Sequence, residues 1–140
     1  MAITTAICSS FRLELLTATH NFAPSGSDTF KLALYPSVAT LGAATTQWTG
    51  GDVTGPGYTY GGVVLTKLTP VLSGTVACAD FQDLTISAVS TTARGCLIYN
   101  SSKSNKAVGV YDFGGDKTSS GGDFIITFPA PDSSNAIIRI

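Results

Sequence analysis

The fold is decided by the stretch Thr29-Phe30-Lys31-Leu32-Ala33-Leu34-Tyr35. Phe30, Leu32 and Leu34 occupy alternate positions, so they fall on one face of an extended chain. Pro36 stops the run, because proline lacks the backbone N–H that an interior strand donates. The stretch therefore predicts a half-buried β-strand.

Short apolar segments separated by turn residues continue from this strand to residue 140. We expect extended segments at 45–49, 58–68, 75–81, 84–89, 93–99, 106–113, 123–128 and 136–140, with polar loops at 100–105 and 114–122. About eight or nine short strands with turn signals roughly every 8–12 residues are typical of an antiparallel β-sandwich or barrel. The apolar last segment should pair within a sheet of this chain or of a neighbour.

One segment before the first strand has helical spacing. Phe11, Leu15 and Ala18 recur at intervals of four and three, and further leucines widen the apolar stripe. This predicts a short helix over residues 10–20, with a strand as the alternative. His20 would then lie at the helix end, near the terminal carbonyls or at the surface. Residues 1–8 would form an N-terminal arm.

Composition restricts the class of protein. The 140 residues suit one domain, here 1–140, and only 12% of them are charged, about half the usual share. A net charge of −1 argues against a nucleic-acid binder of the basic-patch type. Serine and threonine number 34, so the surface should be weakly charged and polar, as suits a protein packed into an assembly.

The N-terminus has no basic segment followed by a long apolar one, so no signal peptide is expected, and no apolar run is long enough to span a membrane. Cys8, Cys78 and Cys96 have spacings that fit no zinc or redox pattern. We expect three reduced, buried cysteines, with one disulfide and a leftover thiol as the alternative. Asn100-Ser101-Ser102 matches a glycosylation acceptor but is interpreted as a turn.

Few residues could carry chemistry. His20 is the only histidine and Glu14 the only glutamate, so neither a nucleophile–histidine arrangement nor a carboxylate pair is indicated. Asp112, Asp116 and Asp123 surround the expected loop at 114–122, where calcium binding is an alternative to a solvated loop. We expect no enzyme, no cofactor and no metal site.

Trp48 precedes the Gly-rich stretch 50–62, and Tyr58 and Tyr60 lie within it. These aromatic side chains either fill the core or bind a partner, and a protein partner is favoured over a sugar.

Several longer strings resemble a known family: Thr29–Tyr35, Gly57-Tyr-Thr-Tyr-Gly-Gly62, Thr92-Ala-Arg-Gly-Cys-Leu-Ile-Tyr-Asn100 and most of 105–140. They are similar to small structural proteins of tailed-bacteriophage particles, in particular the capsid cement (decoration) proteins of short-tailed phages. The resemblance covers nearly the whole chain from about residue 8.

The resemblance implies a jelly-roll β-sandwich on the outside of the phage capsid, bound to the major capsid protein. It implies a homodimer, with a trimer as the alternative, made in the host cytoplasm, with no nucleic acid or membrane partner. From the residues themselves we expect two contact regions, the arm 1–8 and the Gly-rich stretch 50–62. The arm would add a strand to the edge of a neighbour's sheet. Their members are Ile3, Thr4, Ile7, Trp48, Tyr58 and Tyr60. The alternative function is a non-catalytic receptor- or carbohydrate-binding module of the tail or fibre.

Overall fold

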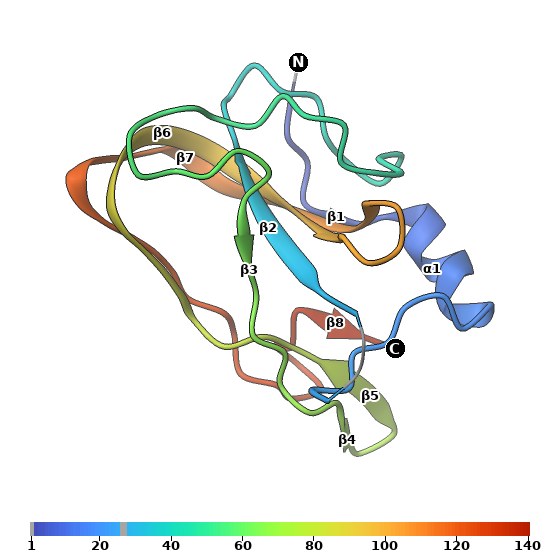
Figure 1. Cartoon of the computed structure of the whole chain (residues 1–140). Helices are drawn as coiled ribbons and strands as arrows, with labels where there is room; N and C mark the ends of the chain where they lie inside the picture. The colour runs from blue at the N-terminus through green and yellow to red at the C-terminus, as the bar shows by residue number, and fades with distance from the viewer. Residues whose placement is uncertain (1, 26–27) are drawn as a thin grey trace.

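The computed structural model describes residues 2–25 and 28–140, so Met1 of the expected arm lies outside the described residues. Two antiparallel sheets and one helix, α1 (Ser9–Leu16), make up the described chain (Figure 1). The larger sheet has the order β1-β7-β6-β2-β3 and the smaller one β4-β5-β8. The strands are β1 (Ala6–Ile7), β2 (Phe30–Tyr35), β3 (Val63–Val64), β4 (Val71–Ser73), β5 (Val76–Ala79), β6 (Leu84–Asn100), β7 (Lys106–Ile126) and β8 (Ile138–Arg139). The prediction of a mostly β, antiparallel protein with a short N-terminal helix is confirmed.

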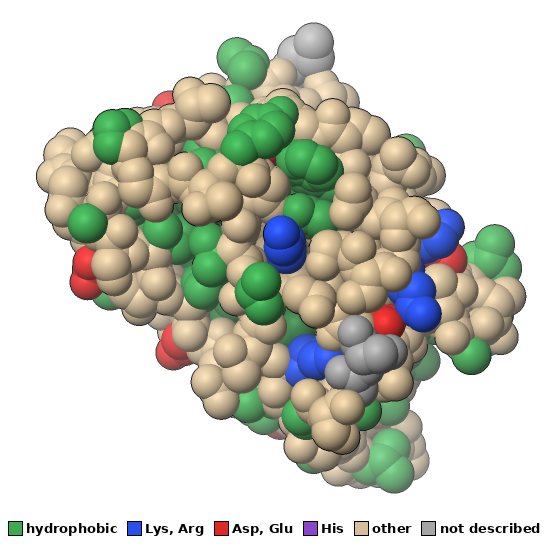
Figure 2. All heavy atoms as spheres, in the orientation of Figure 1, with side chains coloured by type: hydrophobic (Ala, Val, Ile, Leu, Met, Phe, Trp, Pro, Cys, Tyr) green, Lys and Arg blue, Asp and Glu red, His purple; other side chains and the backbone are tan. Residues whose placement is uncertain are grey.

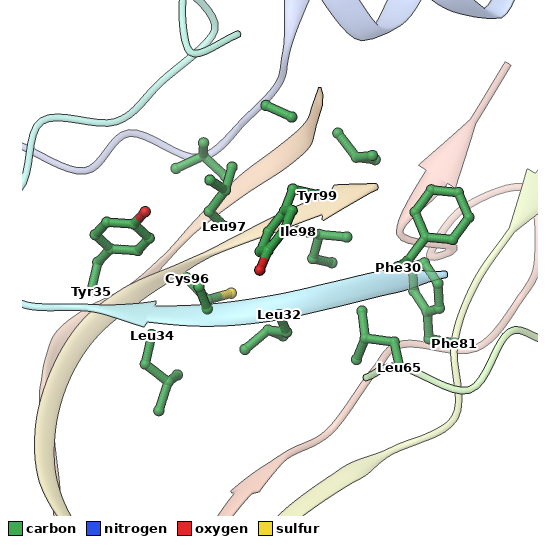
Figure 3. Packing of buried hydrophobic residues seen from close by; sticks show 14 of the residues in the cluster. Phe30, Leu32, Leu34, Tyr35, Leu65, Phe81, Cys96, Leu97, Ile98 and Tyr99 are labelled. Carbon is green, nitrogen blue, oxygen red and sulfur yellow. The ribbon is translucent and has the colours of Figure 1, made fainter. Parts of the chain in front are cut away.

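Strand β2 lies inside the larger sheet. It pairs with β6 from Phe30 opposite Asn100 to Tyr35 opposite Gly95, and with β3 on its other side. All its residues are buried except Lys31, which is half-buried. The predicted strand is therefore correct, but it is buried on both faces rather than one, because other segments cover the second face (Figure 3).

Strands β6 and β7 form one long ribbon, and this corrects the predicted loop at 114–122. Residues 117–120 pair with residues 90–93, so the Gly- and Ser-rich stretch is part of β7. Register shifts interrupt the pairing, and the ribbon curves at the far left of Figure 1. Bulges of this kind bend a strand without ending it, so four predicted short strands are two long ones.

Two other predicted strands, at 45–49 and 58–68, are mostly not strands in the structure. Of 45–49, only Gln47 forms a bridge, to Lys106. Of 58–68, only Val63 and Val64 form a strand, and Lys67 makes one further bridge. Tight turns precede both segments, so few of their residues are extended and able to pair with a strand. The last segment was expected to pair within a sheet of this chain or of a neighbour. It pairs within this chain, where β8 lies beside β5.

Helix α1 is shorter than the predicted 10–20 and is not amphipathic. It ends at Leu16, and Ala18 adopts a left-handed φ of 57°, which an α-helix does not tolerate. Only Phe11 is fully buried, whereas Leu13 and Leu16 are 65% and 86% exposed. Of the apolar stripe predicted along the helix, only Phe11 and the half-buried Leu15 face the core. The prediction is wrong for the rest of the stripe.

The core joins both sheets to the helix. Phe22 stacks on Phe30 with ring centroids 4.4 Å apart, and Phe81 packs against both rings. Figure 3 shows this aromatic end of the core beside Leu32 and Leu65. All three cysteines are free and buried, as predicted. Among the described residues, no helix is long and apolar enough to cross a membrane.

Candidate functional site

A buried polar network ties α1 to the β6–β7 turn. His20 is 8% exposed; its Nε2 lies 2.9 Å from Glu14 Oε1, and its Nδ1 lies 3.0 Å from Asn100 Nδ2. Asn100 also donates to Asp28 Oδ2 at 2.9 Å. The expectation that His20 lies at a helix end or at the surface is wrong, because the chain turns back after Ala18 and carries the ring inward.

The hydrogen bonds define how each group is oriented. Asn100 Oδ1 accepts from the backbone N–H of Ser102 at 3.0 Å, so the side-chain amide nitrogen must face His20. His20 Nδ1 is then an acceptor, and Nε2 carries the proton donated to Glu14. Asn100 is completely buried, which removes it as a glycosylation acceptor and confirms the turn that follows it.

Asp28 is the charged end of this network. Burial raises the pKa of its carboxyl, but hydrogen bonds from Asn100 and the backbone of Asn21 and the charge of Lys103 outweigh burial and hold the pKa below its usual value. Lys103 Nζ lies 3.7 Å from Asp28 Oδ1. The network is therefore built around a buried carboxylate, and its members come from segments up to 80 residues apart.

A second buried carboxylate organises the Gly-rich stretch. Asp52 Oδ2 accepts from the Tyr58 hydroxyl at 2.7 Å and from the Gly61 N–H at 2.8 Å. Tyr58 in turn accepts from the Leu34 N–H, at 3.1 Å. Burial, and then the hydrogen bond to Asp52, raises the pKa of Tyr58, so the phenol stays neutral and donates. The stretch is thus bonded directly to strand β2.

The aromatic side chains beside this stretch have different environments. Trp48 and Tyr58 are half-buried against the core, while Tyr60 is 57% exposed. Trp48 stacks on Tyr99 at 5.6 Å and meets the edge of Tyr60 at 5.7 Å. The structure therefore brings Trp48 and Tyr60 together, with Tyr60 as the more accessible ring. Sequence reasoning missed Tyr99, whose hydroxyl donates to Gly61 O.

An uncharged groove of about 1060 Å³, here called the neutral groove, lies next to the arm. Its walls come from the arm and from the chain between β2 and the Gly-rich stretch. Among the described residues, no lysine, arginine, aspartate or glutamate lines it. Its lining residues are Ala2, Thr4, Tyr35, 39–47, Thr49, Gly50 and Gly51.

The arm belongs to the fold of its own chain. Ile3 is 7% exposed and forms a parallel bridge with Leu41, and Ala6–Ile7 pair with β7. Residues Ala6–Ile7 therefore form the edge strand of this chain's own larger sheet, and pairing of the arm with a neighbour's sheet stays a prediction. Of the predicted contact residues in it, Thr4 is exposed in the neutral groove, Ile7 is half-buried, and Ile3 packs over Gly95.

The acidic residues considered for calcium lie along β7. Asp112 accepts from Arg94 Nε at 2.8 Å, and this hydrogen bond is the main reason that the pKa of Asp112 is lowered. In the described part of the chain, no group of three or more His, Cys, Asp or Glu is placed to hold a metal ion.

Comparison with known proteins adds no relative. No family model, no curated protein and no solved structure matches this chain.

Proposed function

We propose that this protein is a capsid cement protein of a tailed bacteriophage, which binds the outside of the assembled head and stabilises contacts between major capsid protein subunits. The resemblance of the strings at 29–35, 57–62, 92–100 and 105–140 suggests this role. The jelly-roll relationship and the homodimer implied by that resemblance are part of the proposal.

The neutral groove is the observation that carries the proposal. Uncharged polar groups can be buried at an interface at lower cost than ions, and the groove offers about 1060 Å³ bordered only by neutral side chains. On the face shown in Figure 2, uncharged polar groups and backbone also cover most of the surface, and charged side chains are scattered. Such a surface suits a protein that works inside an assembly.

The proposed mechanism is passive. A protein that binds the assembled shell and not the free subunits stabilises the shell through binding free energy. The neutral groove and the Trp48–Tyr60 pair would supply contacts, because large aromatic rings dominate the energetics of many interfaces.

A receptor- or carbohydrate-binding module of the tail remains the second candidate, and the exposed ring of Tyr60 next to Trp48 favours it. A sugar stacked on these rings would change the fluorescence of Trp48, the only tryptophan. Titration with soluble host glycans separates the two functions, since a cement protein should show no such change.

A decoration assay tests the proposal. Purified heads stripped of this protein are mixed with it and sedimented, beside free major capsid protein. We expect binding to heads only, together with a higher temperature of head disruption. Thr4→Arg, which places a charge in the neutral groove, should reduce attachment, whereas Lys117→Glu on the exposed part of β7 should not. Equal binding to free subunits would refute the proposal.

A further inference from the structure

A second groove lies between helix α1 and the edge of the smaller sheet, and it has a different character. It encloses about 560 Å³ and is here called the edge groove. One wall is β8 with the residue after it, and the other is the helix with Ile7 of β1. The residues are Ile7, Phe11, Arg12, Leu15, Leu16 and 138–140. Apart from two arginines, every side chain in it is aliphatic or aromatic.

The β8 wall offers unpaired backbone groups. Ile140 and Ala77 exchange both backbone hydrogen bonds, each 2.9 Å long. In an antiparallel ladder, residue pairs that exchange backbone hydrogen bonds alternate with pairs that exchange none. The neighbouring pair, Arg139 opposite Cys78, is of the second kind, so Arg139 directs its N–H and C=O away from β5. β8 is the last strand of its sheet, and within the described chain these two groups have no backbone partner. This edge can accept another strand.

Among the described residues, the charged side chains that line the groove are two arginines. Arg12 is exposed and its guanidinium makes no hydrogen bond or ion pair with a described residue, and Arg139 donates to Ser134 O at 2.6 Å. No aspartate or glutamate lines the groove. Leu16 lies one helical turn after Arg12 and is 86% exposed, so a cation and an apolar side chain face the same space.

We propose that the edge groove binds an extended segment of a partner protein, which adds a strand to β8 and carries aliphatic side chains with an acidic residue. The backbone of Arg139 would pair with the segment, the apolar walls would take its inward side chains, and Arg12 would meet its carboxylate. This inference rests on the proposed function in one respect: the partner segment is assigned to the capsid shell.

A second copy of this chain fits the edge less well. Two β8 strands paired antiparallel about Arg139 would place the two arginines directly opposite each other, and like charges in that position destabilise a sheet. The edge groove and the neutral groove also share no lining residue, since the first lies between α1 and β8 and the second between the start of the arm and the chain after β2. A protein that ties neighbouring subunits together needs two such separate contacts.

Peptide binding to the full chain tests the groove without capsids. The probe is a short blocked peptide of alternating valine and threonine with one threonine replaced by aspartate, compared with the same peptide carrying lysine. We expect calorimetry to show about tenfold tighter binding of the aspartate peptide, and Arg12→Glu to reverse this preference. Lys117→Glu is the control, because that exposed lysine lies outside the edge groove. Equal binding of both peptides, or none, overturns the proposal.

Proline at position 139 tests the added strand itself. Arg139→Pro and Arg139→Gln both remove the charge and the side-chain hydrogen bond to Ser134. They differ in the backbone, because proline also removes the outward N–H, without breaking a bond to β5, whereas glutamine keeps it. We expect the proline variant to lose peptide binding by about tenfold relative to the glutamine variant, with unchanged thermal unfolding. Equal binding by the two variants, with the fold intact, overturns the proposal.

The same variants separate this proposal from the proposed function. If wild-type protein decorates stripped heads and Arg139→Pro decorates them equally well, the edge groove is not the shell contact and the cement function stands. If wild-type protein binds the aspartate peptide but not heads, the groove binds acidic strands and the cement function is wrong.

Discussion

Asp28 shows how one buried residue makes stability depend on pH. Its pKa in the folded protein lies below the ordinary value of about 3.9, because the hydrogen bonds from Asn100 and Asn21 and the charge of Lys103 outweigh burial. A carboxylate with a lowered pKa contributes stability above its unfolded pKa and loses it as the pH falls through the folded pKa. The contribution of Asp28 is therefore complete near neutrality and decreases below about pH 4.

Asp28→Asn should make this dependence visible. At neutral pH the variant loses the charge that Lys103 and the donors face, so we expect urea unfolding to show a loss of about 1–3 kcal/mol. The difference from wild type should shrink below about pH 4. Asp80 is the matched comparison, because burial raises its pKa, and the effect of Asp80→Asn should change with pH in the opposite sense. A loss at Asp28 that is constant with pH would contradict the assignment.

Gly62 occupies a backbone position in the Gly-rich stretch that only glycine fits. Its φ is +92°, and a Cβ there would lie 2.1 Å from the carbonyl oxygen of Leu32 on strand β2. We expect Gly62→Ala to cost more than about 3 kcal/mol, from backbone strain and the forced movement of β2. Gly114 has a similar φ of +83° with open space around it, so Gly114→Ala should cost only about 1 kcal/mol. Equal losses in denaturant unfolding would show that the close approach is unimportant.

At the scale of the element, the arm combines a structural and an exposed residue side by side. Ile3 is buried, whereas Thr4 is exposed. Ile3→Ala should lower the free energy of unfolding by about 2–5 kcal/mol, while Thr4→Ala should change it by less than about 0.5 kcal/mol. Thermal unfolding of the two variants measures this. A small effect at Ile3 would mean that the arm detaches in solution and is free to bind elsewhere.

The elements also show what a sequence can and cannot predict. The alternation of Phe30, Leu32 and Leu34 is local, and the strand that it predicts is present. The stretch 114–122 reads as a loop because glycine and serine usually end strands. Residues 117–120 of this stretch nevertheless pair with 90–93, because bulges let the strand continue beyond the breaks in register. These partners lie far away in the sequence, so no local pattern predicts the pairing. In α1, the spacing predicts a longer helix than the backbone at Ala18 permits.

At the scale of the whole molecule, the sequence indicates which segment carries the aromatic site but not which side chains contact one another there. Trp48 lies just before the Gly-rich stretch and Tyr60 lies within it, and the structure brings their rings into contact. The stacking on Tyr99 and the network from His20 through Asn100 to Asp28 join residues far apart in sequence, and no local pattern signals them. Only the low proportion of charged residues hints at the neutral groove.

The most direct test of the cement function is the copy number of this protein in purified particles, measured by quantitative mass spectrometry against the major capsid protein. A protein that covers contacts between capsid subunits must be present in hundreds of copies, and its removal should lower the temperature at which heads release their DNA. That is the result we predict. A count of a few tens or fewer would contradict the cement function and favour a module of the tail.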